Sequence, residues 1–99
     1  MDEQEIYETA VRLWGKQFQT DMMIEEATEL IKVILKNRRG KATDDDVISE
    51  MVDCQIMLNQ MRIITNDESK WQRWMAFKLD RLQGLIENDQ KVKPRTVQI

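Results

Sequence analysis

Histidine is absent from the 99 residues of this chain, and cysteine, proline and glycine are scarce. The absence of histidine removes the commonest general base and the commonest ligand of zinc, copper and nickel, so metal chemistry here would use oxygen ligands. The single Cys54 excludes an intramolecular disulfide. With 3 glycines and 1 proline there is little turn material, which favours long helices joined by short loops.

The overall composition is typical of a small folded protein. Hydrophobic residues make up 41% and charged residues 33%, and the length fits one domain. A formal net charge of -3 gives no general attraction to nucleic acid or to an anionic membrane. The residues after Met1 lack the basic and apolar stretches of a signal peptide, and no apolar run is long enough to span a membrane. We therefore expect a cytoplasmic protein.

Apolar spacing predicts four helices and no strand. Gly15 and Gly40 are the expected stops of the first two helices, while Thr20 and Thr43 are candidate N-caps of the second and third. We predict an all-α fold, a four-helix bundle-like single domain over residues 1–87 with a loose tail over 88–99. The expected helices cover 2–14, a range that begins between 16 and 21 and ends near 40, then 43–64 and 68–87.

Acidic residues occupy matching positions on the second and third expected helices. Each helix has an apolar stripe and, beside it, an acidic pair with apolar neighbours: Glu26 with Glu29, and Glu50 with Asp53. If the helices are antiparallel neighbours, these four residues, the acidic quartet, face one another across a groove. The stripes are Met23, Ala27, Leu30, Ile31 and Ile34 on one helix, and Val47, Met51, Cys54, Leu58 and Met61 on the other.

Crowded carboxylates of this kind predict a metal site. Bare carboxylates with apolar neighbours would take up protons or bind a cation, because an uncompensated buried charge is costly. Ligation by oxygen alone favours Mg²⁺ or Mn²⁺, and calcium is disfavoured because no EF-hand-type loop is present. The competing interpretation is that glutamate at helical spacing is usually a solvated surface residue, and it applies to any single member taken alone.

Two charged residues outside the acidic quartet, Glu25 and Lys78, have two open interpretations each. Glu25 lies nearly opposite the apolar stripe, so it is either a surface residue or a group that serves a second metal position or orients water. Lys78 projects from the apolar stripe of the fourth helix. Either its stem packs while its amine reaches water, or the amine is aimed at the acidic quartet or at a phosphate held by its metal. In the second case Arg81, about one turn away, could join Lys78.

The pattern Glu25-Glu26-x-x-Glu29, followed after 20 intervening residues by Glu50-x-x-Asp53, resembles the signature of the MazG-like all-α nucleoside triphosphate pyrophosphohydrolases. The resemblance implies a MazG-type domain that hydrolyses a nucleoside triphosphate to the monophosphate and pyrophosphate. It also implies Mg²⁺ as the cofactor and the acidic quartet as its ligands. A bound cation of this kind neutralises phosphate charge and makes water a better nucleophile.

The surrounding residues extend this resemblance over residues 6–85. Trp14-Gly15 and Gln19, ahead of the first acidic motif, and residues 24–36 around it are similar to the compact single-domain members encoded by phages and bacteria. A phage-encoded member would work in the cytoplasm of its host.

The resemblance also suggests roles for residues outside the acidic quartet. Lys78 and Arg81 match the usual basic positions of the last helix and would bind the substrate. With no histidine available, Glu25 or Glu29 is the expected base for the attacking water, unless the metal alone suffices. Trp14 is the first candidate for a platform under the nucleobase, ahead of the two tryptophans of the fourth helix, although tryptophan more often packs in a core.

The second and third helices are apolar over most of their circumference, which a lone four-helix monomer could not cover. We therefore predict a homodimer or a dimer of dimers, in which the neighbouring chain can supply part of each active site. The apolar residues outside the stripes are Met22, Ile24 and Leu35 on one helix and Val52, Ile56 and Ile63 on the other.

Other functions remain compatible with the same residues. Phosphoribosyl-ATP pyrophosphatases and dimeric dUTPases use similar acidic helices. A helical binding or regulatory module without catalysis could use the acidic residues to hold an ion or a basic partner. Nucleic-acid binding through Arg38, Arg39 and Lys41 is the weakest alternative, because basic residues at a helix end are more often a solvated C-terminal turn.

Overall fold

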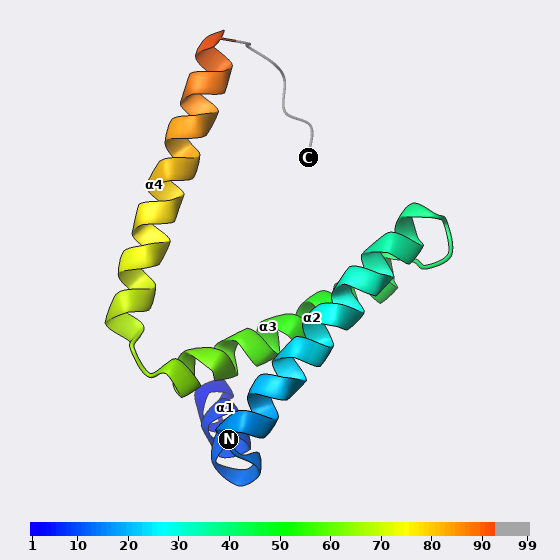
Figure 1. The fold of residues 1–99 in the computed structure, drawn as a ribbon, viewed down its shortest axis with the longest axis vertical. Coiled ribbons are helices and arrows are strands. Elements are labelled where there is room, and N and C mark those ends of the chain that lie inside the picture. Colours follow the sequence, from blue (N-terminus) through cyan, green and yellow to red (C-terminus); the bar gives the residue numbers. More distant parts are fainter. Residues whose placement is uncertain (93–99) are drawn as a thin grey trace. The chain divides into compact units, whose positions relative to one another are not determined.

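The computed structural model describes residues 1–92, which form four α-helices and no strand (Figure 1). This confirms the predicted all-α fold class. Helices α1 to α3 belong to one packed unit, Met1–Asn66, and α4 belongs to a second unit that begins at Asp67. No helix within the described part is long and apolar enough to cross a membrane. The helices are α1 (Glu3–Trp14), α2 (Lys16–Arg38), α3 (Asp44–Thr65) and α4 (Glu68–Val92).

Local side-chain interactions explain where α1 and α3 begin and where α3 ends. The Asp2 carboxylate accepts a hydrogen bond from the Glu5 backbone N–H at 2.8 Å and caps α1. Thr43 caps α3 as predicted, in a reciprocal capping box: its hydroxyl accepts from the Asp46 N–H at 3.1 Å, and the Asp46 carboxylate accepts from the Thr43 N–H at 2.8 Å. Asn66 ends α3 in a left-handed conformation with φ 51°.

The start of α2 lies in the predicted range, but one candidate N-cap and one predicted helix end are wrong. Helix α2 begins at Lys16, so Thr20 is not an N-cap but lies inside the helix, where its hydroxyl donates to the Lys16 carbonyl at 2.8 Å. Helix α4 continues to Val92 rather than ending near Glu87, because no glycine or proline interrupts the chain between these residues. The last part of the predicted loose tail, 93–99, lies outside the described residues.

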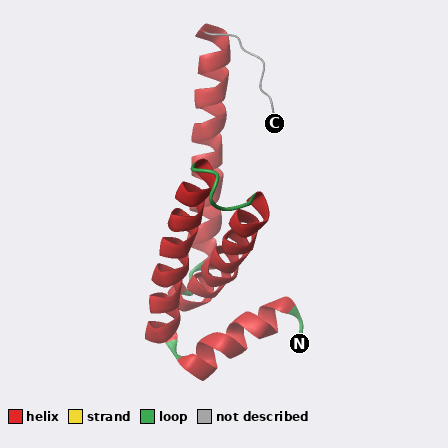
Figure 2. Cartoon of the chain, turned by 90° about the vertical axis from the view of Figure 1, so that its right-hand side faces the viewer, coloured by secondary structure: helices red, strands yellow, loops and turns green. Residues whose placement is uncertain are grey.

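Helices α2 and α3 form an antiparallel hairpin (Figure 1). Gly40, with φ 71°, follows the end of α2, as predicted for its stop. The Asn37 side-chain amide donates to the Ala42 carbonyl and to the Asp44 carboxylate, both at 3.0 Å, and so ties the connecting loop to both helices. Helix α1 packs across the open end of the hairpin and contacts both of its helices (Figure 2).

The core of this unit is small and partly polar. A hydrogen bond of 2.6 Å joins the side chains of Gln19 and Gln60, each of which is 4% exposed. The Asn59 amide donates to the Tyr7 hydroxyl at 3.1 Å and links α3 to α1. These polar contacts therefore fix how the three helices meet. The buried hydrophobic side chains are Tyr7, Val11, Cys54 and Met57.

The faces that α2 and α3 turn toward each other coincide only in part with the predicted apolar stripes, of which Cys54 is buried. Met57, on the acidic flank of α3, is buried, whereas the stripe residues Ile31 and Met51 are 60% and 53% exposed. The inner face of each helix is thus rotated by about 60° from the stripe toward the acidic pair. Because both helices are apolar on more than one side, hydrophobic spacing alone does not determine which side is buried.

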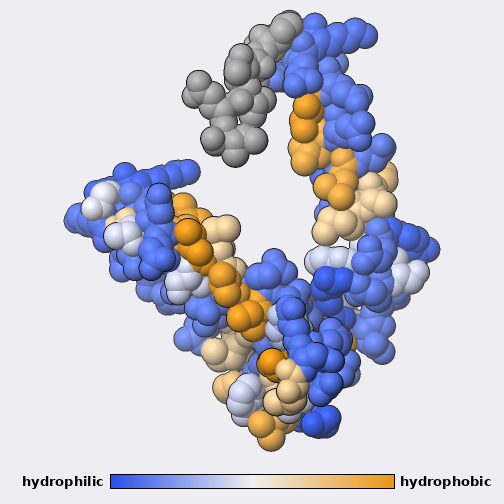
Figure 3. Space-filling view, turned by 180° about the vertical axis from the view of Figure 1, so that it is seen from behind, coloured by the Kyte–Doolittle hydropathy of each residue, from blue (hydrophilic) through white to orange (hydrophobic). Residues whose placement is uncertain are grey.

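This rotation leaves hydrophobic side chains exposed along the hairpin, and α4 carries exposed hydrophobic side chains of its own (Figure 3). On α4, Trp74 packs edge-to-face against Phe77, with their ring centroids 5.9 Å apart. The exposed hydrophobic residues of the hairpin are Phe18, Ile24, Ile31, Ile34, Leu35, Ile48, Met51, Val52, Ile56 and Leu58.

Candidate metal centre

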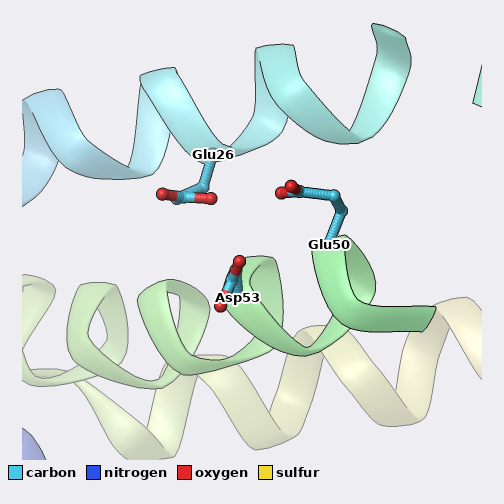
Figure 4. Close-up of side chains that lie close together, drawn as sticks. All are labelled: Glu26, Glu50 and Asp53. Carbon is cyan, nitrogen blue, oxygen red and sulfur yellow. The ribbon is translucent and has the colours of Figure 1, made fainter. Parts of the chain in front are cut away.

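Three carboxylates converge between the middle of α2 and the first half of α3. Glu26 extends from α2, and Glu50 and Asp53 extend from α3 toward it (Figure 4). One oxygen atom from each lies within 4.8 Å of the others. We call these residues the acidic triad. They are three of the four members of the acidic quartet predicted from the sequence.

The register of the hairpin brings the acidic triad together. Gln19 precedes Glu26 by seven residues, and Gln60 follows Asp53 by seven residues. Seven residues are about two helical turns, so each glutamine shares a face with its acidic residue. Because the helices are antiparallel, the hydrogen bond between the glutamines places Glu26 across from Asp53. Glu50, one turn before Asp53, then faces the same space.

The acidic triad concentrates negative charge without a compensating cation. Burial raises the pKa of Glu26, and the neighbouring Asp53 and Glu50 carboxylates raise this pKa further. No lysine or arginine among the described residues forms an ion pair with any of the three carboxylates. The folded chain therefore holds three like charges together, with Glu26 and Glu50 half-buried and Asp53 exposed, and this repulsion costs free energy unless a cation is bound.

Glu50 supplies an unpartnered ligand atom. Its Oε2 is buried and has no hydrogen-bond partner within the described part of the chain. A carboxylate oxygen that is buried in this way normally has a hydrogen-bond donor or a metal ion as its partner. Oxygen donors alone fit Mg²⁺ or Mn²⁺. The donor set and the orphaned oxygen thus both fit a hard divalent cation.

Cys54 lies beside the acidic triad but does not extend its ligand set. The thiol is buried, and burial first and the nearby carboxylates second raise its pKa above the ordinary value. A raised pKa keeps the thiol protonated at neutral pH, and a protonated thiol is neither a strong nucleophile nor a metal ligand. Cys54 is therefore a small core residue of α3.

The other two glutamates of the motif lie at the edge of the acidic triad. Glu29 is outside the group of three, and its carboxylate forms an ion pair with Lys32 at 3.6 Å. Glu25 is exposed. Both carboxylates are close enough to raise the pKa of Glu26. Glu29 as a fourth ligand, and either residue as a base, stay predictions.

The predicted substrate-binding residues lie on other elements. Trp14 is the last residue of α1, and 58% of its surface is exposed. The Lys78 amine lies 5.6 Å from the centre of the Trp74 ring, in a cation–π arrangement on α4. Arg81 is an exposed residue of the same helix. Helix α4 belongs to the second unit of the chain, so an approach of Lys78 and Arg81 to the acidic triad stays a prediction.

Sequence reasoning missed a groove beside the acidic triad. It has a volume of about 320 Å³ and runs along the second half of α2, the connecting loop and the start of α3. Glu29 and Glu50 line it together with Lys32, Lys36 and Lys41. Of these lysines, only Lys41 is a candidate binding residue on the sequence alone. The sequence does indicate part of this groove. Lys32 and Lys36 lie three and seven residues after Glu29 and so share its side of the helix.

Comparisons of the chain with protein-family models, with curated proteins and with solved structures give no match. The resemblance to MazG-like enzymes therefore rests on the acidic motif and its surrounding residues.

Proposed function

We propose that this protein is a Mg²⁺-dependent nucleoside triphosphate pyrophosphohydrolase of the MazG-like kind, releasing a nucleoside monophosphate and pyrophosphate. The observation that carries the proposal is the convergence of Glu26, Glu50 and Asp53. One oxygen atom of each lies within 4.8 Å of the others, and none of the three carboxylates has a cationic partner among the described residues. A structural role would favour paired or neutral side chains at this position. Unpaired acidic oxygens are the ligands that a catalytic divalent cation requires.

The residues that would hold the cation are the acidic triad and Glu29. In the structure the Glu29 carboxylate pairs with Lys32, whose side chain is 57% exposed. An exposed ion pair of this kind contributes only about 0–1 kcal/mol, so it offers little resistance if a cation draws Glu29 away. Mg²⁺ is the proposed cofactor, and Mn²⁺ is a possible substitute because it accepts the same oxygen ligands.

The proposed chemistry divides between the cation and the protein. When bound, the cation neutralises phosphate charge and lowers the pKa of water. Glu25 or Glu29 would accept the proton of the attacking water, since the chain has no histidine. Lys78 and Arg81 would bind the triphosphate, and Trp14 would offer its exposed ring to the nucleobase.

The test is an assay of pyrophosphate release from the ribo- and deoxyribonucleoside triphosphates, with Mg²⁺ and with a chelator. We expect release only with Mg²⁺. A strong preference for deoxyuridine triphosphate, or activity on phosphoribosyl-ATP alone, would move the protein to the related enzymes with those substrates. Absence of release from every nucleotide, in a protein that is folded and binds Mg²⁺, would contradict the proposal and favour a non-catalytic module.

We further propose that the active form is a homodimer or a dimer of dimers. On α2, Ile24, Ile31 and Leu35 share one side and are 62%, 60% and 44% exposed. On α3, Ile48 and Val52 are 55% and 51% exposed. Exposed apolar surface on this scale marks an association site. Burying it against a second chain is favourable by about 25 cal/mol per Å² of apolar surface.

A substitution in this apolar surface tests the assembly. We expect Val52→Glu to shift the protein toward the monomer in analytical ultracentrifugation, because dimerisation would bury its charge. Gln90→Glu, at an exposed position of α4, is a control that adds the same charge outside the apolar surface of the hairpin. A wild-type protein that sediments as a clean monomer at micromolar concentration would contradict the proposed assembly.

A further inference from the structure

Three lysines line the groove beside the acidic triad, which we call the lysine groove. Lys32 and Lys36 extend from α2, and Lys41 extends from the loop that connects α2 to α3. The volume of about 320 Å³ is large enough for a small ligand. Its acidic lining residues are Glu29, Asp46 and Glu50, and its remaining residues are Val33, Ala42 and Ser49.

The loop that carries Lys41 is held in place by hydrogen bonds. The Lys41 backbone N–H donates to the Lys36 carbonyl at 2.9 Å. The Asn37 amide donates to the Ala42 carbonyl at 3.0 Å. These hydrogen bonds fix the connecting loop at the hairpin tip and hold the backbone of Lys41 against the end of α2.

Two of the three acidic residues of the groove are already engaged. Asp46 caps α3 through Thr43, and Glu29 pairs with Lys32. Glu50 belongs to the acidic triad. In contrast, Lys36 and Lys41 form no ion pair within the described part of the chain. A cation on the acidic triad would compensate Glu50 and leave these two ammonium groups to attract an anion.

We propose that the lysine groove binds the pyrophosphate end of the substrate, and that Lys36 and Lys41 hold its β- and γ-phosphates. This inference rests on the proposed function, because it assigns a direction to a triphosphate at the acidic triad. Lysine is a common phosphate ligand through its compact positive charge. The lining contains no aromatic residue that could stack on a nucleobase. The nucleoside therefore extends from the acidic triad toward α1, away from the hairpin tip.

The test compares two double variants that remove the same charge from neighbouring positions. Lys36→Gln with Lys41→Gln changes the groove, whereas Arg38→Gln with Arg39→Gln changes exposed residues of the same region that do not line it. Calorimetry with Mg²⁺ alone, with pyrophosphate in excess Mg²⁺, and with a nucleoside monophosphate in excess Mg²⁺ provides the readout. None of these measurements requires turnover.

We expect the groove variant to bind pyrophosphate at least about tenfold more weakly than wild type while its affinities for Mg²⁺ and for the monophosphate change less than about twofold. The arginine variant should bind all three ligands like wild type. Equal loss of pyrophosphate affinity in both variants, or loss in neither, would overturn the proposal. So would a wild-type protein that binds Mg²⁺ but not pyrophosphate.

These outcomes separate the two proposals. If the wild-type protein hydrolyses no nucleotide but its pyrophosphate binding depends on Lys36 and Lys41, the proposed function fails and the anion site stands. If it hydrolyses nucleotides and the groove variant has unchanged pyrophosphate affinity and unchanged kcat/KM, the enzyme stands and the lysine groove does not bind the phosphates.

Discussion

Helices α2 and α3 bring polar side chains together at two places, and the two places differ in how well the groups are satisfied. Near α1, the amides of Gln19 and Gln60 are buried and share a hydrogen bond of 2.6 Å. About two turns along the hairpin, the acidic triad brings carboxylates together with no such bond, and Glu50 Oε2 is buried without a partner. The groups of the first place pair with each other, whereas those of the second have no positive partner within residues 1–92.

This difference assigns different roles to the two places. A neutral, satisfied pair of amides contributes register and specificity to the packing of two helices. A group of acidic residues with a raised pKa at Glu26 opposes packing unless a cation is bound. The glutamine pair therefore holds the hairpin in the register at which the acidic triad forms, and the acidic triad offers the unpaired oxygen atoms that the proposed cation site needs.

The largest effect should follow removal of acidic ligands. We expect Glu50→Gln combined with Asp53→Asn to reduce Mg²⁺-dependent pyrophosphate release by more than about 100-fold, because loss of even an outer partner of a metal ligand costs about 10–100-fold. Circular dichroism should show the same helix content as wild type. Full activity in this double variant would remove the acidic triad from the mechanism.

The glutamine pair should affect stability and leave metal binding alone. Gln60→Leu leaves the buried Gln19 amide without its partner, so we expect a loss of about 1–3 kcal/mol in the free energy of unfolding. Urea denaturation measures it. The double variant Gln19→Leu with Gln60→Leu should recover most of the loss, because neither buried amide is then unpaired. A lowered Mg²⁺ affinity in the stable double variant would show that the two places are not separate.

The smallest effect concerns pH in the presence of a chelator. The raised pKa of Glu26 means that the folded state binds its proton more tightly than the unfolded state. This contribution to stability is fully present below the unfolded pKa and is lost as the pH rises through the folded pKa.

Glu26→Gln isolates that contribution from those of other carboxyls. Asp46, for example, acts in the opposite direction because its hydrogen bonds to Thr43 lower its pKa. We expect Glu26→Gln to raise Tm relative to wild type at neutral pH without Mg²⁺, and the difference to shrink as the pH falls. A difference in Tm that does not change with pH would show that Glu26 bears no repulsion in the folded protein.

The sequence predicted the all-α class because its apolar residues recur at helical spacing and few residues interrupt the helices. The convergence of Glu26, Glu50 and Asp53 was also predictable, since each acidic pair occupies the same phase of its helix. The rotation of α2 and α3 was not, because both helices have more than one apolar side. Gln19 and Gln60 could have indicated the register by their shared spacing from Glu26 and Asp53, although amides carry no hydrophobic signal.

The placement of Glu29 and Lys41 does not follow from helical spacing, so it could not be predicted. Glu29 is equally compatible with the metal site and with the neighbouring Lys32, and helical spacing does not decide between an i,i+3 ion pair and a ligand. The lysine groove needs Lys41, whose position depends on the hydrogen bonds of the connecting loop rather than on any periodic pattern.

The central claim is that the acidic triad holds a divalent cation. Its most direct test is calorimetric titration of the metal-free protein with Mg²⁺ and with Mn²⁺, for wild type, Asp53→Asn, and Gln19→Leu with Gln60→Leu. We predict saturable binding of both ions to wild type and to the glutamine double variant, and its loss in Asp53→Asn. Equal binding by Asp53→Asn and wild type, or no binding by wild type, would contradict the claim.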